Sequence, residues 1–250
     1  MKMRTTAILN LKGGVAKTTT AINMAAILAQ DHKKRVLLID ADSQCNSTDF
    51  YGGTVPGRCT MSDLLRRTDV NSPILESSFP GVDIIPADDS LMDLDLSKVE
   101  NKTVDVQCLS KLLKRVTRYD YVLIDCPPAF NAATASALLA ADDVVIPIKL
   151  DAFAIQGMAN LMRQVENMKR VNPRLRVAGI LPVMWYRSAK VAAAETMLRE
   201  SKLHIFSHIR RSPTVDAMTY SQIPLCAGSR NSGAGRDYKD FVEEYIGGEE

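Results

Sequence analysis

The segment from Asn10 to Thr20, with the sequence NLKGGVAKTTT, constrains the fold more than any other part of this chain. A short apolar run at 6–9 precedes it, and a helical pattern at 21–29 follows it. A strand, a glycine-rich loop and a helix in this order form the frame that binds phosphate in many nucleotide-binding proteins. Amides at the start of such a helix have no partners within the chain, so we expect a polyphosphate to accept their hydrogen bonds.

The side chains of this segment favour a nucleotide and a metal ion. Gly13 and Gly14 let the backbone curl around an anion, and Lys17 places a positive charge near the β and γ oxygens of a triphosphate. The hydroxyl of Thr18 is placed to ligate Mg²⁺. The candidate nucleotide-binding residues here are Gly13, Gly14, Val15, Ala16, Lys17, Thr18 and Thr19. A glycine turn that binds nothing is the competing interpretation, but two lysines and three threonines at these spacings serve no packing purpose.

Composition places the chain among ordinary globular proteins. The 250 residues are 46% hydrophobic and 24% charged, which suffices for a well-buried core, and we expect one domain over 1–250. A net charge of +2 does not by itself predict nucleic-acid binding, so a DNA-binding surface would have to be a local patch. Five cysteines without a C-x-x-C pair, no apolar run of roughly 18 residues and no secretory h-region predict a cytoplasmic protein.

The order of apolar runs and helical patterns predicts a doubly wound α/β fold with a mostly parallel sheet and helices on both faces. Expected strands lie at 6–9, 36–39, 82–85, 121–124, 144–148 and 177–181. Expected helices lie at 21–29, near 104–118, 132–141, 154–171 and 190–201, and at about 237–246. The regions 43–81 and 227–235 are expected to be loops. Ligands of such folds bind beyond the carboxyl ends of the strands.

Two of these strands end in carboxylates. Asp40 and Asp42 follow the run at 36–39, and their alternation points them different ways, so that one can serve a metal and the other can face an attacking water. Asp125 follows the run at 121–124, which is typical of a Walker B strand whose carboxylate supports Mg²⁺ through water. The candidate metal residues are Thr18, Asp42 and Asp125. A strand end with merely solvated carboxylates is the competing interpretation for Asp40 and Asp42.

These motifs together resemble the deviant Walker A group of P-loop ATPases that contains ParA and MinD. The pattern K-G-G-x-x-K-T-T matches, with Leu11 and Ala16 at the two glycine positions of the ordinary motif, and Asp125-Cys126-Pro127-Pro128 is similar to the D-x-P-P switch. Further similarity, at 145–148, 151–157, 179–181 and 223–234, extends over nearly the whole chain and identifies the ParA/Soj type. The resemblance implies ATP and Mg²⁺ as ligands and ATP hydrolysis as the activity, slow without a partner.

The resemblance also implies roles for single residues. Lys12 would reach across a homodimer interface to the nucleotide of the other subunit, and Lys17 would be the ordinary P-loop lysine. Asp42 would be needed for hydrolysis, with Asp40 supporting the loop and the metal. The catalytic candidates are therefore Lys12, Lys17 and Asp42. Ser43 and Cys45 stand where the family has proline and glycine, which favours a more mobile loop.

The family's partners are non-specific DNA and a DNA-bound activator of the ParB type, which implies a nucleoid-associated protein. Arg187 and Arg211 match the family's DNA-binding positions, whereas Arg210 and Thr214 depart from its pattern. The basic residues that could meet DNA are Arg187, Lys190, Arg210, Arg211, Arg230 and Arg236. A solvated basic surface is the competing interpretation.

Two other functions on the same fold stay open. A MinD-like membrane regulator would need a basic amphipathic C-terminal helix, but the segment 237–246 is acidic and short, so no membrane partner is expected. The other is an ATP-dependent ligase or a metal-cluster protein. Cluster-bearing relatives need cysteines from both subunits at the dimer axis, and beside Cys126 no second suitable cysteine is evident. His32, His204 and His208 show no metal-ligand spacing, and Trp185 favours packing over a contact with a partner or a base.

Overall fold

The computed structural model describes residues 3–66, 73–151 and 154–248, without the side chains of 154–156. Residues 67–72, part of the expected loop region 43–81, lie outside these ranges, as do the side chains at 154–156 within the family-like segment 151–157. The strands are β1 (Arg4–Ile8), β2 (Val36–Asp40), β3 (Leu75–Glu76), β4 (Val82–Ile85), β5 (Tyr121–Asp125), β6 (Asp143–Lys149) and β7 (Arg176–Val183). The helices are α1 (Lys17–Gln30), α2 (Asn46–Phe50), α3 (Met61–Arg66), η1 (Asp89–Asp93), α4 (Leu96–Glu100), α5 (Cys108–Leu113), α6 (Ala132–Ala140), α7 (Ala154–Lys169), α8 (Ala189–Arg199), α9 (Pro213–Ser221), α10 (Leu225–Gly228) and α11 (Gly233–Gly247).

Within the described residues these strands form a seven-stranded sheet in the order β3-β4-β2-β5-β1-β6-β7. Only the short edge strand β3 is antiparallel to its neighbour, and the other pairs are parallel. The expected doubly wound α/β fold is therefore confirmed. Because all the parallel strands end at one edge, the segments that follow β1, β2, β5 and β6 meet there.

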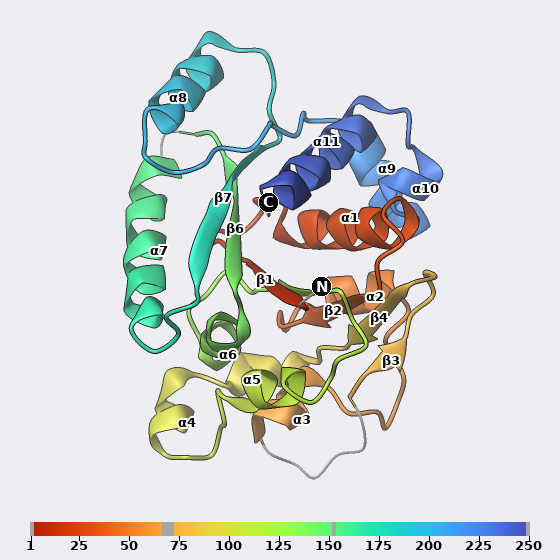
Figure 1. The fold of residues 1–250 in the computed structure, drawn as a ribbon, viewed down its shortest axis with the longest axis vertical. Coiled ribbons are helices and arrows are strands. Elements are labelled where there is room, and N and C mark those ends of the chain that lie inside the picture. The colour runs from red at the N-terminus through yellow and green to blue at the C-terminus, as the bar shows by residue number, and fades with distance from the viewer. Residues whose placement is uncertain (1–2, 67–72, 152–153, 249–250) are drawn as a thin grey trace.

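Two apolar layers cover the sheet, one on each face (Figure 1). Leu37 and Ile39 of β2 face the layer of α3, α5, α6 and α7, whereas Val36 and Leu38 face the layer of α1 and α11. This alternation explains why the central strands are continuously apolar: side chains on both faces are buried. By the same alternation, Asp40 and Asp125 at the strand ends point to the face covered by α1.

Several expected element boundaries were wrong. The helix expected near 104–118 is only α5, because Asp105 makes a turn in which its side chain accepts a hydrogen bond from the amide of Gln107 (3.0 Å). The expected loop 43–81 contains α2 and α3, and α9 was missed although Ser212 and Pro213 form a typical helix start.

The C-terminal helix starts earlier than the sequence suggests, inside the expected loop 227–235. Ser232 caps α11 by accepting a hydrogen bond from the amide of Gly235 (3.0 Å). A Cβ atom at Gly235 would lie 2.6 Å from the carbonyl oxygen of Ser229, so this glycine allows close packing rather than marking a loop.

Candidate nucleotide-binding site

The loop between β1 and α1 is held in a curled shape by its first residues. Asn10 is buried, and its amide nitrogen donates to the carbonyl of Pro147 (2.7 Å) while its side-chain oxygen accepts from the amide of Lys12 (3.0 Å). Gly14 and Ala16 both have positive φ, 67° and 57°. Ala16 is the residue before α1, and no side chain caps this helix start. The first amides of α1 therefore point out of the helix without a side-chain acceptor, as an anion site requires.

Lys17 lies inside this curl rather than in solvent. Lys17 is only 7% exposed, and its Nζ donates to the carbonyl of Lys12 (3.2 Å). Burial lowers the pKa of Lys17, and the nearby carboxylates Asp125 and Asp42 oppose this effect. A buried ammonium group beside open helix amides gives the loop a positive potential, which favours a polyphosphate.

Asp40 and Asp125 lie side by side at the ends of the neighbouring strands β2 and β5. Both are completely buried, yet they differ in their hydrogen bonds. Asp40 accepts from the amide of Asp42 (3.1 Å) and from the amide and hydroxyl of Thr48 (2.8 and 2.7 Å). Burial and the charge of Asp125 raise the pKa of Asp40 to about 7. Asp40 thus ties the loop after β2 to the sheet, and both of its oxygens are already used.

Asp125 keeps one oxygen open. Its Oδ2 accepts from the hydroxyl of Ser47 (2.8 Å), whereas Oδ1 is buried and has no hydrogen-bond partner among the described residues. Burial raises the pKa of Asp125 to about 6, against the effect of the hydroxyls of Ser47 and Thr18. An unsatisfied buried carboxylate oxygen is costly unless a ligand completes it. This oxygen, near the hydroxyl of Thr18, fits a hard cation such as Mg²⁺.

No group of three or more His, Cys, Asp or Glu side chains in the described ranges is arranged to hold a metal ion. A cation beside Asp125 would therefore draw most of its ligands from a hydroxyl, from water and from phosphate oxygens. Mg²⁺ is commonly bound in this way, with few protein carboxylates and several waters.

The loop after β2 places Asp42 close to the curl of the P-loop. Asp42 is 9% exposed, and its Oδ1 accepts from the amide of Gln44 (3.1 Å). Cys45 has a φ of 56°, a backbone conformation that glycine adopts more easily than cysteine. Cysteine at this position, where the family has glycine, therefore holds the backbone under strain. Burial raises the pKa of the Cys45 thiol to about 12, so the thiol stays neutral.

Comparison with known proteins identifies the family. A family profile described as an AAA domain matches residues 3–177. The chromosome partitioning protein ParA of Caulobacter vibrioides is 37% identical over 207 residues, covering 81% of this chain and 76% of that protein. The sporulation initiation inhibitor protein Soj of Bacillus subtilis is 37% identical over 182 residues, 71% of each. The structure of apo McdA from Cyanthece has a TM-score of 0.85 at 25% identity, covering 98% of this chain and 99% of McdA.

This chain belongs to the ParA family of P-loop ATPases. The resemblance inferred from its motifs is therefore confirmed, as is the fold. Membership of the family does not by itself assign roles to single residues.

The ParA-type lysine, Lys12, forms an ion pair within its own chain. Its Nζ contacts Oδ2 of Asp151, the residue that lies just beyond β6. Both side chains are partly exposed, 40% and 30%. The sequence pointed to Asp151 only as part of the family-like segment 151–157, and its pairing with Lys12 was not foreseen because the two lie 139 residues apart. To reach another subunit, Lys12 would have to leave this contact.

A pocket of about 370 Å³ opens beside the P-loop. It lies between α1, α2 and α9, and Thr18, Thr19, Asn46 and Thr219 supply polar groups to its wall. Its volume falls in the range of small-ligand sites. Ser47 and Thr48 of α2, whose hydroxyls bond the two strand-end carboxylates, were also missed, although hydroxyl residues five and six positions after a D-x-D segment offered a signal.

The six candidate DNA-contacting cations differ in their partners. Arg210 makes two hydrogen bonds of 2.8 Å to Asp237, and Arg230 pairs with Asp31 at 3.2 Å. Arg236 donates to a main-chain carbonyl, that of Asn231. These three side chains are thus engaged within the chain.

Arg187, Lys190 and Arg211 are exposed, and none has a side-chain partner within the part of the chain that the structure describes. The structure brings the first and last of them near each other, because the amide of Arg211 donates to the carbonyl of Trp185 (2.7 Å). They lie near the end of β7, which is two strands from β1 in the sheet.

The C-terminal helix uses its apolar face for packing. Phe241, Val242 and Tyr245 of α11 are buried in the layer that contains α1. No helix in the described ranges is both long and apolar enough to cross a membrane. His204 pairs with Glu244 and His208 stacks on Trp185, so both histidines have structural contacts. Trp185 itself lies only half-buried and not in the core, contrary to the preference for core packing.

Proposed function

We propose that this protein is a ParA-like ATPase, one domain over residues 1–250, that binds MgATP in the curl between β1 and α1. Amides of residues 13–19 and the ammonium of Lys17 hold the phosphates, with the hydroxyls of Thr18 and Thr19 at the start of the helix. The buried position of Lys17 and the uncapped helix start support this part. The pocket beside Thr18 gives room for the rest of a nucleotide.

The three carboxylates Asp40, Asp42 and Asp125 have different roles around the metal and the attacking water. Mg²⁺, when bound, would neutralise phosphate charge and orient the triphosphate. Asp125 offers it the open Oδ1, and Thr18 offers a hydroxyl. Asp42 orients the attacking water from the loop after β2 and belongs to the outer shell of the metal. Asp40 keeps this loop in place through Thr48.

ATP joins two copies of the chain, and Lys12 of each copy reaches the phosphates of the other. In the free chain Lys12 is paired with Asp151, so formation of the dimer exchanges a partly exposed ion pair for a contact with phosphate. Exposed ion pairs contribute about 0–1 kcal/mol, so this exchange is favourable once a triphosphate is present. Hydrolysis is slow in the isolated protein because it requires both the dimer and an aligned water.

The ATP-bound dimer binds DNA without sequence preference through Arg187 and Arg211, and a DNA-bound activator of the ParB type stimulates hydrolysis and release. Exposed arginines without partners in the described chain support this part. Contacts to phosphates alone carry no sequence information. We expect the protein in the cytoplasm, associated with the nucleoid, where it positions or segregates chromosomal or plasmid DNA.

The observation that carries the proposal is the open, buried oxygen of Asp125 beside the buried ammonium of Lys17. The test is a DNA mobility assay with ADP, ATP and a slowly hydrolysed ATP analogue at several salt concentrations. We expect DNA retention only with ATP or the analogue, and weaker retention as salt rises. Arg211→Glu should weaken retention while ATP affinity stays unchanged. Retention that is equal with ADP and ATP would contradict the proposal.

A further inference from the structure

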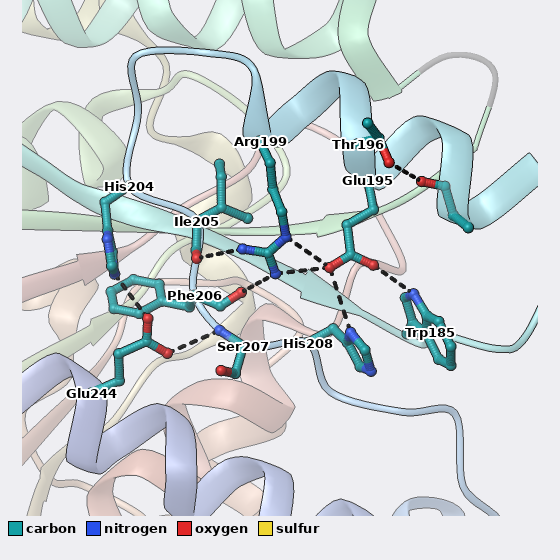
Figure 2. A network of polar contacts seen from close by, with 11 residues as sticks. Trp185, Glu195, Thr196, Arg199, His204, Ile205, Phe206, Ser207, His208 and Glu244 are labelled. Atoms are coloured by element: carbon teal, nitrogen blue, oxygen red, sulfur yellow. Dashed lines mark hydrogen bonds and ion pairs between the residues drawn. The ribbon is translucent and has the colours of Figure 1, made fainter.

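Trp185 lies at one end of a network of polar contacts that converges on Glu195 (Figure 2). Its indole nitrogen donates to Oε2 of Glu195 (2.8 Å), and its ring stacks on His208 with a centroid distance of 4.1 Å and an angle of 6°. His208 Nδ1 lies 3.6 Å from Oε1 of the same carboxylate. We call Trp185, Glu195, Arg199 and His208 the Glu195 cluster.

Arg199 connects this cluster to a neighbouring segment. Its guanidinium donates to Oε1 of Glu195 (2.8 Å) and to the carbonyls of Ile205 (3.2 Å) and Phe206 (3.5 Å) (Figure 2). Burial raises the pKa of Glu195, but hydrogen bonds from Arg199 and Trp185 outweigh it, so the pKa lies below its ordinary value. The carboxylate is therefore charged and accepts hydrogen bonds from two residues, Trp185 and Arg199, with His208 close beside it.

The helix α8 depends on these polar contacts. Only Val191 and Leu198 of its eleven residues are buried. A helix with so little apolar contact is held mainly by whatever else ties it to the body of the protein. Here Glu195 and Arg199 tie the helix to Trp185, just after β7, and to 205–208.

The two arginines flank the cluster. Arg187 lies between Trp185 and the start of α8, in a loop where Met184 has a φ of 54°. The amide of Arg211 donates to the carbonyl of Trp185 (2.7 Å), and the amide of Trp185 donates to the carbonyl of Ile209 (2.9 Å). These main-chain hydrogen bonds fix the backbone of Arg211 beside Trp185, and Arg187 follows Trp185 by two residues.

We propose that Glu195 is a positioning residue for DNA binding, which through Trp185, His208 and Arg199 holds Arg187 and Arg211 in one fixed arrangement against the phosphates of a duplex. This inference rests on the DNA-binding part of the proposed function. A binding surface that is ordered in advance loses less side-chain and loop entropy when its partner binds. The contribution of Glu195 is thus geometric, since a carboxylate repels DNA.

This repulsion lets one substitution distinguish a positioning role from a purely electrostatic effect. Removing a negative charge near a DNA surface should tighten binding if only long-range electrostatics matter. Glu195→Ala removes the same charge but also releases Trp185, His208 and Arg199 from their common acceptor. The positioning role therefore predicts the opposite sign, a loss of affinity.

The experiment measures DNA affinity of the full chain with a slowly hydrolysed ATP analogue, for the wild type and for variants. Glu195→Ala should bind roughly tenfold more weakly, equivalent to about 1.4 kcal/mol. Glu200→Ala is the matched control, because it removes an exposed carboxylate at the end of the same helix without touching the cluster. It should bind DNA as well as the wild type or slightly more tightly.

Two further measurements separate positioning from general damage. The double variant with Arg211→Ala should lose less affinity than the sum of the two single losses, because Glu195 acts partly through that arginine. Trp185 is the only tryptophan of the chain, so its fluorescence reports the cluster directly. The emission should change in Glu195→Ala and stay unchanged in Glu200→Ala, while analogue-dependent dimerisation is kept in both.

Three results would overturn the inference. Glu195→Ala could bind DNA as tightly as Glu200→Ala, its loss could add fully to that of Arg211→Ala, or its loss could be matched by an equal loss of dimerisation. A wild-type protein that does not bind DNA at all is a different outcome. It would overturn the DNA-binding part of the proposed function, and this inference with it.

Discussion

Asp125 and Asp143 are buried carboxylates at opposite edges of the same sheet, and they are satisfied in different ways. Asp143, at the start of β6, accepts from Arg4, from Arg176 (2.6 Å) and from the hydroxyl of Tyr245 (2.9 Å). Asp125, at the end of β5, leaves Oδ1 without a partner in the described chain. Burial raises the pKa of both, and at Asp143 the contact with Arg4 opposes the shift.

This difference distinguishes a buried carboxylate that stabilises the fold from one that belongs to a ligand site. At the amino edge the chain supplies all the partners of its buried charge, so that Asp143 joins β1, β7 and α11. At the carboxyl edge the chain supplies only part of them, and the missing partner fits a cation bound to phosphate. A buried charge that the fold itself does not satisfy indicates a ligand site.

The largest expected effect is the loss of ATP affinity caused by a substitution at the carboxyl edge of the sheet. Lys17→Ala should abolish ATP binding, lowering the affinity by more than roughly a hundredfold. The substitution removes the only buried ammonium among the described residues from the loop between β1 and α1. Calorimetric titration with MgATP measures this. Lys202→Ala, an exposed lysine far along the chain, is the control. Unchanged affinity in Lys17→Ala would show that the curl does not bind phosphate.

Substituting the two carboxylates should affect stability in opposite ways. Asp143→Asn leaves Arg4 and Arg176 without their acceptor charge and should cost about 3 kcal/mol of unfolding free energy. Asp125→Asn removes a charge that lacks a full set of partners, so without nucleotide it should leave stability unchanged or raise it by about 1 kcal/mol. Denaturant unfolding of both variants measures the contrast, and equal losses would refute it.

The pH dependence of stability sharpens the same comparison. The pKa of Asp125 is about 6 in the folded chain, above its ordinary value of 3.8. Between these pH values the unfolded chain has lost this proton while the folded chain keeps it, so wild-type stability falls as pH rises. Because burial and the charge of Asp125 together raise the pKa of the neighbouring Asp40 to about 7, the stability of Asp125→Asn relative to the wild type should increase from about pH 4 to about pH 7 and then level off. A difference that is independent of pH would contradict the raised pKa.

The smallest effect concerns backbone strain in the loops of the carboxyl edge. Ala16 and Cys45 have φ values of 57° and 56°, where a Cβ atom costs about 1–2 kcal/mol. Glycine relieves this cost but makes the unfolded chain more flexible by about 0.4–1 kcal/mol. Ala16→Gly and Cys45→Gly should each stabilise the protein by about 0.5 kcal/mol, measured by thermal unfolding. Destabilisation in both would show that their side-chain contacts outweigh the strain.

The sequence predicted the central strands and the curled loop between β1 and α1 because their signals are local. Continuous apolar runs predict strands buried on both faces, and the glycine-rich segment ends at the start of α1. The helices α9 and α11 were missed or shortened because Pro213 and Gly235 usually mark loops, whereas here they serve a helix start and close packing. Local patterns cannot distinguish these uses.

The chemical difference between Asp40 and Asp125 also lay beyond the sequence. Both follow apolar strands, yet Thr48 satisfies Asp40 whereas Asp125 keeps an open oxygen. In the same way, the contact of Lys12 with Asp151 depends on the packing of β1 beside β6. Ser47 is 78 residues from Asp125, and Asp151 is 139 residues from Lys12, so only the folded chain identifies these partners.

The central claim is that the carboxyl edge of the sheet binds MgATP and thereby joins two copies of the chain. Asp42→Ala should slow hydrolysis without weakening ATP binding, so it keeps the nucleotide in place during the measurement. We expect light scattering of this variant with saturating MgATP to give the mass of a dimer, and Lys12→Ala in the same background to give a monomer. A monomeric Asp42→Ala protein that is saturated with MgATP would contradict the account.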